Sequence, residues 1–128
     1  MMVIRKPTSE LYNDYTTRMQ QLADVRNAIA VLGWDQETYL PEKGAAFRGQ
    51  QITTLSSIAH EMFAAAPLGE ILQELHQRQD LTPVQQKNVA LSLEDYEKNK
   101  RYPAAFVAAL SQATNACYHA WIKARKAN

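Results

Sequence analysis

The sequence is poor in the residues that disulfides, tight turns and membrane spans require. It has one cysteine, Cys117, and four glycines among 128 residues, while alanine is abundant. One cysteine excludes an intrachain disulfide, which suits a reducing compartment. Scarce glycine and frequent alanine favour helices. No run approaches the roughly 20 apolar residues of a membrane helix, and none follows Met1 to Lys6 as a signal peptide requires. We therefore expect a cytoplasmic protein.

A strong excess of charge of either sign is also missing, because the formal net charge is only +1. Nothing in this balance draws the chain to nucleic acid or to an anionic membrane. The basic residues gather in two short groups: Lys98, Lys100 and Arg101, and Lys123, Arg125 and Lys126. Both groups lie near the expected ends of helices, where cations complement the helix dipole. We expect neither a nucleic acid nor a membrane as partner.

Apolar residues at helical spacing are what the sequence has instead. The first stripe comprises Leu11, Tyr15, Leu22, Val25, Ile29 and Leu32. This spacing predicts a long helix that begins after Pro7, with Thr8 or Ser9 as its cap, and that Pro41 stops. Similar patterns predict helices over about 45–65, 68–79 and 83–100, and a last helix opened by Pro103.

The clearest helix start lies at Thr82 and Pro83. Thr82 can cap the helix, Pro83 suits the first helical position, and Gln85 completes a capping box. No alternation typical of β-strands competes with the helical patterns. The sequence thus predicts an all-α fold of four to five helices with short loops, similar to a helical bundle, in a single domain over residues 1–128.

Metal chemistry requires ligands at particular spacings. A zinc peptidase helix carries two His at i and i+4 with a Glu after the first. The only His-Glu pair is His60-Glu61, and Ala64 stands where the second His should be. The Glu-x-x-His spacing of di-iron bundles is also missing from the sequence. We expect no metal ligand and no cofactor-binding residue in this chain.

Two further features have competing interpretations. Cys117 lies on an apolar stripe, which favours a small buried side chain over a nucleophile. In Trp34-Asp35-Gln36-Glu37-Thr38, Asp35 and Glu37 could act as acid and base. Alternatively, Trp34 fills the core while its polar neighbours bond backbone groups at the helix end. We favour the structural interpretation, and expect a similar large contact from Trp121.

The segment around Trp34 resembles the N-terminal region of the carboxypeptidase Taq family, peptidase family M32. The likeness includes residues 31–41, Gly44, Arg48, residues 51–61 and 68–72, Tyr96, Pro103, residues 110–111, and the stretch from Trp121 through Ala124 and Arg125 to Asn128. The similar residues occur in linear order over nearly the whole chain. The Trp-Asp-Gln-Glu-Thr segment and the helix with Ala59-His60-Glu61 are the most specific parts.

The resemblance implies a mostly helical, cytosolic and usually homodimeric carboxypeptidase that removes C-terminal residues from peptides. In that family zinc or cobalt is held by the two His of a His-Glu-x-x-His helix and a later Glu, far downstream of the region matched here. No catalytic residue is therefore transferred to this chain, which we expect to be inactive alone. The family-signature residues, expected to be structural, are Trp34, Asp35, Gln36, Glu37, Thr38, Pro41, Arg48, His60, Glu61 and Trp121.

Three hypotheses remain open for function. The first is a non-catalytic N-terminal segment of a metallocarboxypeptidase, whose partner is the missing catalytic domain or a second copy, with peptide as substrate only in the full-length enzyme. The second is a stand-alone helical interaction or dimerisation protein. The third is an unrelated binder of small ligands, with a pocket lined by Tyr12, Tyr15, Tyr39 and Tyr118.

Overall fold

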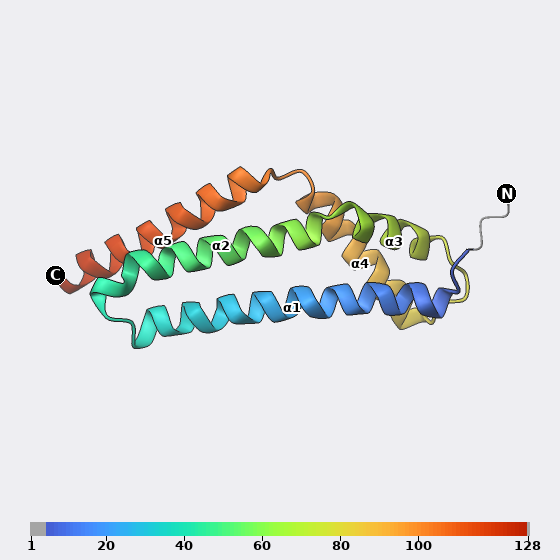
Figure 1. The fold of residues 1–128 in the computed structure, drawn as a ribbon, viewed down its shortest axis with the longest axis horizontal. Coiled ribbons are helices and arrows are strands. Elements are labelled where there is room, and N and C mark those ends of the chain that lie inside the picture. Colours follow the sequence, from blue (N-terminus) through green and yellow to red (C-terminus); the bar gives the residue numbers. More distant parts are fainter. Residues whose placement is uncertain (1–4, 128) are drawn as a thin grey trace. The chain divides into compact units, whose positions relative to one another are not determined.

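The computed structural model describes residues 5–127, and all regular structure in this part of the chain is helical (Figure 1). The elements are α1 (Thr8–Thr38), the 3-10 helix η1 (Glu42–Gly44), α2 (Ala45–Ala64), α3 (Ala66–His76), α4 (Pro83–Asn99) and α5 (Ala104–Ala127). The predicted all-α fold is confirmed. None of the described helices is both long and apolar enough to cross a bilayer.

The helix boundaries follow the local signals with one difference. α1 continues through Gly33 and ends at Thr38, shortly before the stop expected at Pro41, since one glycine costs only about 1 kcal/mol inside a long helix. α3 begins at Ala66, earlier than expected, because Pro67 fits the first helical turn rather than lying before it. The capping box is confirmed: Thr82 Oγ1 accepts from the Gln85 amide at 3.3 Å, and Gln85 Oε1 accepts from the Thr82 amide at 2.9 Å.

The helices group into two compact units. Unit 1 comprises residues 1–22 and 62–101, and unit 2 comprises residues 23–61 and 102–128. The grouping neither confirms nor contradicts a single domain over residues 1–128, which stays a prediction.

Unit 1 has an apolar core between the start of α1, α3 and α4. Its buried apolar side chains are Leu11, Tyr15, Leu22, Phe63, Leu68, Leu72, Leu75, Leu81, Val89 and Tyr96. Tyr15 reaches this core from α1, and its hydroxyl lies 2.7 Å from Ser92 Oγ and donates to the Asn88 carbonyl at 3.3 Å. Burial raises the pKa of Tyr15 above its usual range. These two hydrogen bonds satisfy the hydroxyl group, which would otherwise be an unpaired polar group in the core.

Gly69 lets α3 and α4 approach closely within unit 1. A Cβ atom at this position would lie 2.4 Å from Cζ and from the hydroxyl oxygen of Tyr96. Tyr96 in turn packs edge to face against Phe63, with ring centroids 6.4 Å apart. The absence of a side chain at Gly69 is thus what allows the Tyr96 ring to enter the core.

A polar network ties the start of α1 to the end of α3. Thr8 Oγ1 donates to Asp80 at 2.9 Å and accepts from Arg78 at 3.1 Å, so the expected capping residue contacts the segment after α3. Glu74 accepts from Arg78 at 2.5 Å and from Arg5 at 3.0 Å. The hydrogen bonds from Arg78 and then Arg5 hold the pKa of Glu74 below its usual range.

Unit 2 exposes apolar residues that the sequence predicted to be buried. Trp34 is 58% exposed and Trp121 is 53% exposed, and Cys117 also lies at the surface. The predictions that Trp34 fills the core, that Trp121 makes a similar large contact and that Cys117 is buried are therefore wrong for the described structure. The stripes were identified correctly, but in unit 2 no described element covers these three side chains.

Candidate functional site

The Trp34–Thr38 segment forms the last turn of α1. The Thr38 hydroxyl donates to the Trp34 carbonyl at 2.7 Å, and the Tyr39 and Leu40 amides both donate to the Asp35 carbonyl at 3.0 Å. Trp34 contacts Tyr39 edge to face, with centroids 5.5 Å apart. The segment therefore ends a helix, and the Thr38 hydroxyl bonds a backbone carbonyl as the structural interpretation expected.

Arg48 joins this helix end to α2. Its Nη1 donates to Asp35 Oδ2 at 2.7 Å and to the Leu32 carbonyl at 3.0 Å, and its Nε donates to Gln51 Oε1 at 3.1 Å. The Arg48 side chain is only 15% exposed, against 34% for Asp35. Because Asp35 is held in this charge-assisted bond, its carboxylate stabilises the helix connection. The sequence singled out both residues but did not predict that they pair.

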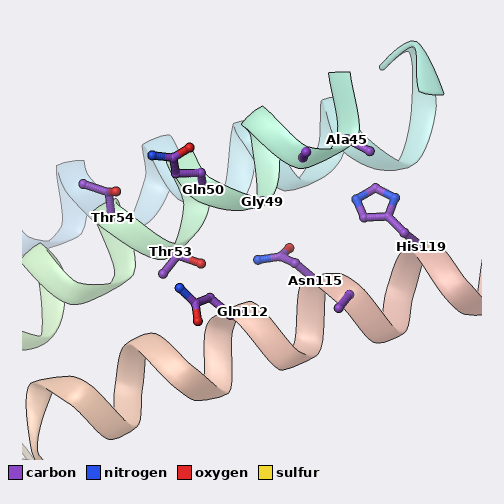
Figure 2. A pocket seen from close by; sticks show the side chains of 10 residues that line it. Ala45, Gly49, Gln50, Thr53, Thr54, Gln112, Asn115 and His119 are labelled. Carbon is purple, nitrogen blue, oxygen red and sulfur yellow. The ribbon is translucent and has the colours of Figure 1, made fainter. Parts of the chain in front are cut away.

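A groove runs between α2 and α5, which lie antiparallel in unit 2. Thr53 Oγ1 donates to Ser111 Oγ at 3.2 Å, while nearer the start of α2 a Cβ at Gly49 would lie 3.6 Å from that of Asn115. Figure 2 shows the Thr53, Gln112 and Asn115 side chains in the space between the two helices. The groove has a volume of about 750 Å³ and is lined largely by amides, hydroxyls and alanines.

Sequence reasoning missed the polar side of α5 that lines this groove. Ser111, Asn115 and His119 follow one another at intervals of four, which places them on one face of a helix. Asn115 Oδ1 accepts from Gln36 Nε2 at 3.4 Å, and its Nδ2 donates to the Ser111 carbonyl at 2.9 Å. The spacing of these polar residues by four, on a helix rich in alanine, is the sequence signal that could have predicted this polar face.

Two buried polar atoms near the groove have no hydrogen-bond partner among the described residues: Gln36 Oε1 and His119 Nε2. Both side chains also line a second pocket of about 580 Å³, together with Glu37, Lys123 and Lys126 among others. In Figure 2 the His119 ring projects from α5 toward Ala45 at the start of α2. An amide oxygen accepts hydrogen bonds and an imidazole can accept or donate them, but together they supply no nucleophile with an adjacent base.

His60 and Glu61 lie in α2 and do not form a metal site. His60 Nε2 lies 2.7 Å from the Tyr102 carbonyl, which can only accept, so this nitrogen donates and is not free to bind a cation. Among residues 5–127, no three His, Cys, Asp or Glu side chains are grouped so that they could hold a metal ion. The donor set in this part of the chain does not fit a catalytic zinc or cobalt.

The tyrosines proposed for a ligand pocket have different roles. Tyr12 and Tyr15 belong to unit 1, where their rings contact edge to face at 5.4 Å and Tyr15 is buried in the core. Tyr39 is 75% exposed, and Tyr118 lines the second pocket. Of the four tyrosines on which that hypothesis depends, only Tyr118 lines a described pocket of unit 2.

Comparisons with known proteins agree on one family. The model of the carboxypeptidase Taq (M32) metallopeptidase family matches residues 14–128. Carboxypeptidase 1 from Bacillus subtilis (strain 168) is 28% identical over 88 residues, which are 68% of this chain and 18% of that protein. Thermostable carboxypeptidase 1 from Thermus thermophilus is 26% identical over 117 residues, or 89% of this chain and 23% of that protein.

Two solved structures share the fold. The M32 carboxypeptidase from Deinococcus radiodurans R1 is 36% identical with a TM-score of 0.77, and the protein CHT is 72% identical with a TM-score of 0.74. In both cases the match covers 92% of this chain and 24% of the solved chain. The sequence thus spans a quarter or less of the proteins it resembles.

Proposed function

Because the chain belongs to the carboxypeptidase Taq (M32) metallopeptidase family, we propose that it is an N-terminal, non-catalytic helical segment of a metal-dependent carboxypeptidase. The whole enzyme would remove C-terminal residues from peptides, with zinc or cobalt bound outside this segment, as a dimer in the cytoplasm. The segment would contribute a helical surface to that enzyme and would be inactive alone.

The observation that supports this proposal is the exposed apolar surface of unit 2. Its exposed large apolar residues are Val31, Trp34, Tyr39, Phe47, Ile58, Tyr102, Phe106, Leu110 and Trp121. Proteins rarely leave so many large apolar side chains in water unless another surface covers them. The matched relatives supply a source for that surface, since this chain covers only 24% of each solved one.

The chemistry available in this chain agrees with a non-catalytic role. Its His-Glu pair has one imidazole, which donates to a backbone carbonyl. Catalysis of peptide hydrolysis by a metal requires a bound water that the metal acidifies, and a carboxylate that takes its proton. The residues described in α2 do not assemble these parts.

A chimeric enzyme tests the proposal. Residues 14–127 would replace the matching quarter of the Deinococcus radiodurans carboxypeptidase, and release of C-terminal amino acids from a peptide would be measured. We expect activity in the chimera and none in the isolated chain, whose zinc content after purification would be measured as well. The matched control is the host enzyme lacking that quarter, which we expect to be inactive. Turnover with one tightly bound metal per isolated chain would contradict the proposal, as would an inactive chimera.

The second candidate, a stand-alone interaction protein, is favoured by unit 1. This unit buries ten apolar side chains of its own, so part of the chain has the core a folded module needs. Reading the gene downstream of the Asn128 codon distinguishes the candidates: a continuous frame that encodes His-Glu-x-x-His favours the segment, and a stop codon favours the stand-alone protein.

A further inference from the structure

The exposed face of α5 carries a regular apolar seam. We use the term α5 seam for six residues of this face: Phe106, Leu110, Ala113, Cys117, Ala120 and Ala124. All six are exposed, and they alternate in steps of four and three along the helix. Alternating steps of four and three form the heptad pattern by which a helix packs against a second long helix at a small crossing angle.

The other face of α5 contacts the rest of unit 2 partly through polar groups. Ser111 bonds Thr53, and Asn115 bonds Gln36. No residue in the described α5 is buried, although the helix has 24 residues. A surface helix normally turns its apolar stripe to the core and its polar side to water. In α5 the half-buried side mixes polar residues with Val107 and Ile122, whereas the six seam residues face solvent and have no element among the described residues to pack against.

The side chains of the seam restrict the shape of what can cover it. Phe106 and Leu110 are large and about half exposed, whereas the following positions from Ala113 to Ala124 are small. Small side chains allow a second helix to approach closely and to place its own large side chains against them. A complementary partner therefore has small residues opposite Phe106 and large ones opposite Ala120.

The charges that α5 itself carries near the seam are of one sign, although Glu37 and Glu42 of neighbouring elements line a pocket with Ala120 and Lys123. Lys123 and Arg125 stand on either side of Ala124 in the sequence, at the C-terminal end of the seam. The 24 residues of α5 include neither Asp nor Glu. The Arg125 guanidinium lies over the ring of Trp121, 5.2 Å from its centroid, beside the seam. A partner with carboxylates along its edge would meet opposite charges here, whereas a second α5 would bring further cations but no carboxylate.

We propose that the α5 seam is the docking surface for one long amphipathic helix with an acidic edge, supplied by the part of the M32 carboxypeptidase that this chain does not cover. The inference rests on the proposed function and names the partner of its exposed surface. The seam then becomes a buried helix-helix contact of the complete enzyme.

The same substitutions in the isolated chain and in the chimera test the inference. Leu110→Asp places a charge on the seam, and Ala120→Leu fills the space that a close helix would use. Leu91→Asp is the matched control, since Leu91 is 49% exposed and Leu110 is 56% exposed. In the isolated chain we expect all three to leave the helix content unchanged. In the chimera, Leu110→Asp and Ala120→Leu should each lower the melting temperature by about 5 °C or more, because one kcal/mol shifts it by a few degrees.

Thiol labelling of Cys117 measures directly whether the α5 seam is covered. Cys117 is exposed in the isolated chain and should react there with a maleimide at the rate of a free thiol. In the chimera, peptide mapping should show labelling of Cys117 slowed by roughly an order of magnitude, and Leu110→Asp should restore much of that rate.

The outcomes separate the two proposals. An active chimera with an unprotected Cys117 and unchanged melting temperatures in the variants would overturn the seam as a docking surface and leave the proposed function standing. An inactive chimera would count against the function itself and against the docking helix that rests on it. If the isolated chain dimerises and Leu110→Asp makes it monomeric, a second copy occupies the seam, and the assignment to the remaining enzyme is wrong.

Discussion

Unit 1 folds around its own core, whereas unit 2 leaves its largest apolar side chains in solvent. Among the described residues, ten of the eleven buried apolar side chains belong to unit 1, and unit 2 contributes Ala59. Nine of the eleven exposed large apolar residues belong to unit 2, and Val84 and Leu91 belong to unit 1. Since both units are built from long helices, the difference lies in which faces find a neighbour. Unit 1 encloses an apolar core, and unit 2 leaves large apolar side chains that no described residue buries.

The largest effect should come from removing a core leucine of unit 1. Leu72 is fully buried, so Leu72→Ala should lower the free energy of unfolding by about 2–5 kcal/mol through lost transfer energy and the cavity left behind. Leu110→Ala, the same change at an exposed position of unit 2, should alter it by less than about 0.5 kcal/mol. Urea unfolding followed by circular dichroism measures both. Equal losses would show that the two units do not differ in this way.

Replacing one glycine in each unit by alanine should give a smaller difference in stability between the two units. Gly69→Ala in unit 1 should cost about 1–3 kcal/mol, because its Cβ would lie 2.4 Å from the Tyr96 ring. Gly33→Ala in unit 2 meets nothing within 4 Å and should instead stabilise α1 by up to about 1 kcal/mol. Thermal unfolding of both variants gives the sign. A neutral Gly69→Ala would mean that α3 and α4 move apart readily.

The ion pair between Arg48 and Asp35 in unit 2 should contribute less to the free energy of unfolding than the core leucine of unit 1. Arg48→Met should lower stability by about 1–2 kcal/mol, because the Leu32 carbonyl and Asp35 lose their charged donor. Lys98→Met in unit 1 is the control, and should leave stability nearly unchanged since its pair with Glu94 is exposed. In a double-mutant cycle, Arg48→Met and Asp35→Asn should be clearly non-additive. Additive losses would argue against the pair.

The smallest expected effect is the pH dependence of the network at Glu74. Its pKa is lowered in the folded chain, so the unfolded chain binds more protons at acidic pH. The contribution of Glu74 is therefore fully present above the ordinary pKa of 4.5 and is lost as pH falls through the lowered value. Glu74→Gln should make the melting temperature less sensitive to pH below about 4.5. An unchanged pH profile in this variant would contradict the role of the Arg78 and Arg5 bonds.

Local signals predicted the helices, but not which of their faces are covered. The capping box at Thr82 and Gln85 depends on neighbours in sequence, and the structure confirms it. The exposure of Trp34 and Cys117 depends on elements that pack against them, which periodicity does not name. The pairing of Arg48 with Asp35 requires the relative register of α1 and α2, and neither helix encodes this register alone. The core of unit 1 follows its stripes because the covering helices are part of this chain.

The position of the two tryptophans gives unit 2 its own optical signal. Trp34 and Trp121 are the only tryptophans of the sequence, and both belong to unit 2. Indole fluorescence, excited at wavelengths that tyrosine does not absorb, therefore arises from unit 2 without a contribution from unit 1. Since both rings are more than half exposed, the isolated chain should emit at the long wavelengths typical of water-accessible indole. A shift of this emission to shorter wavelengths would follow the covering of unit 2 in real time, without an added label.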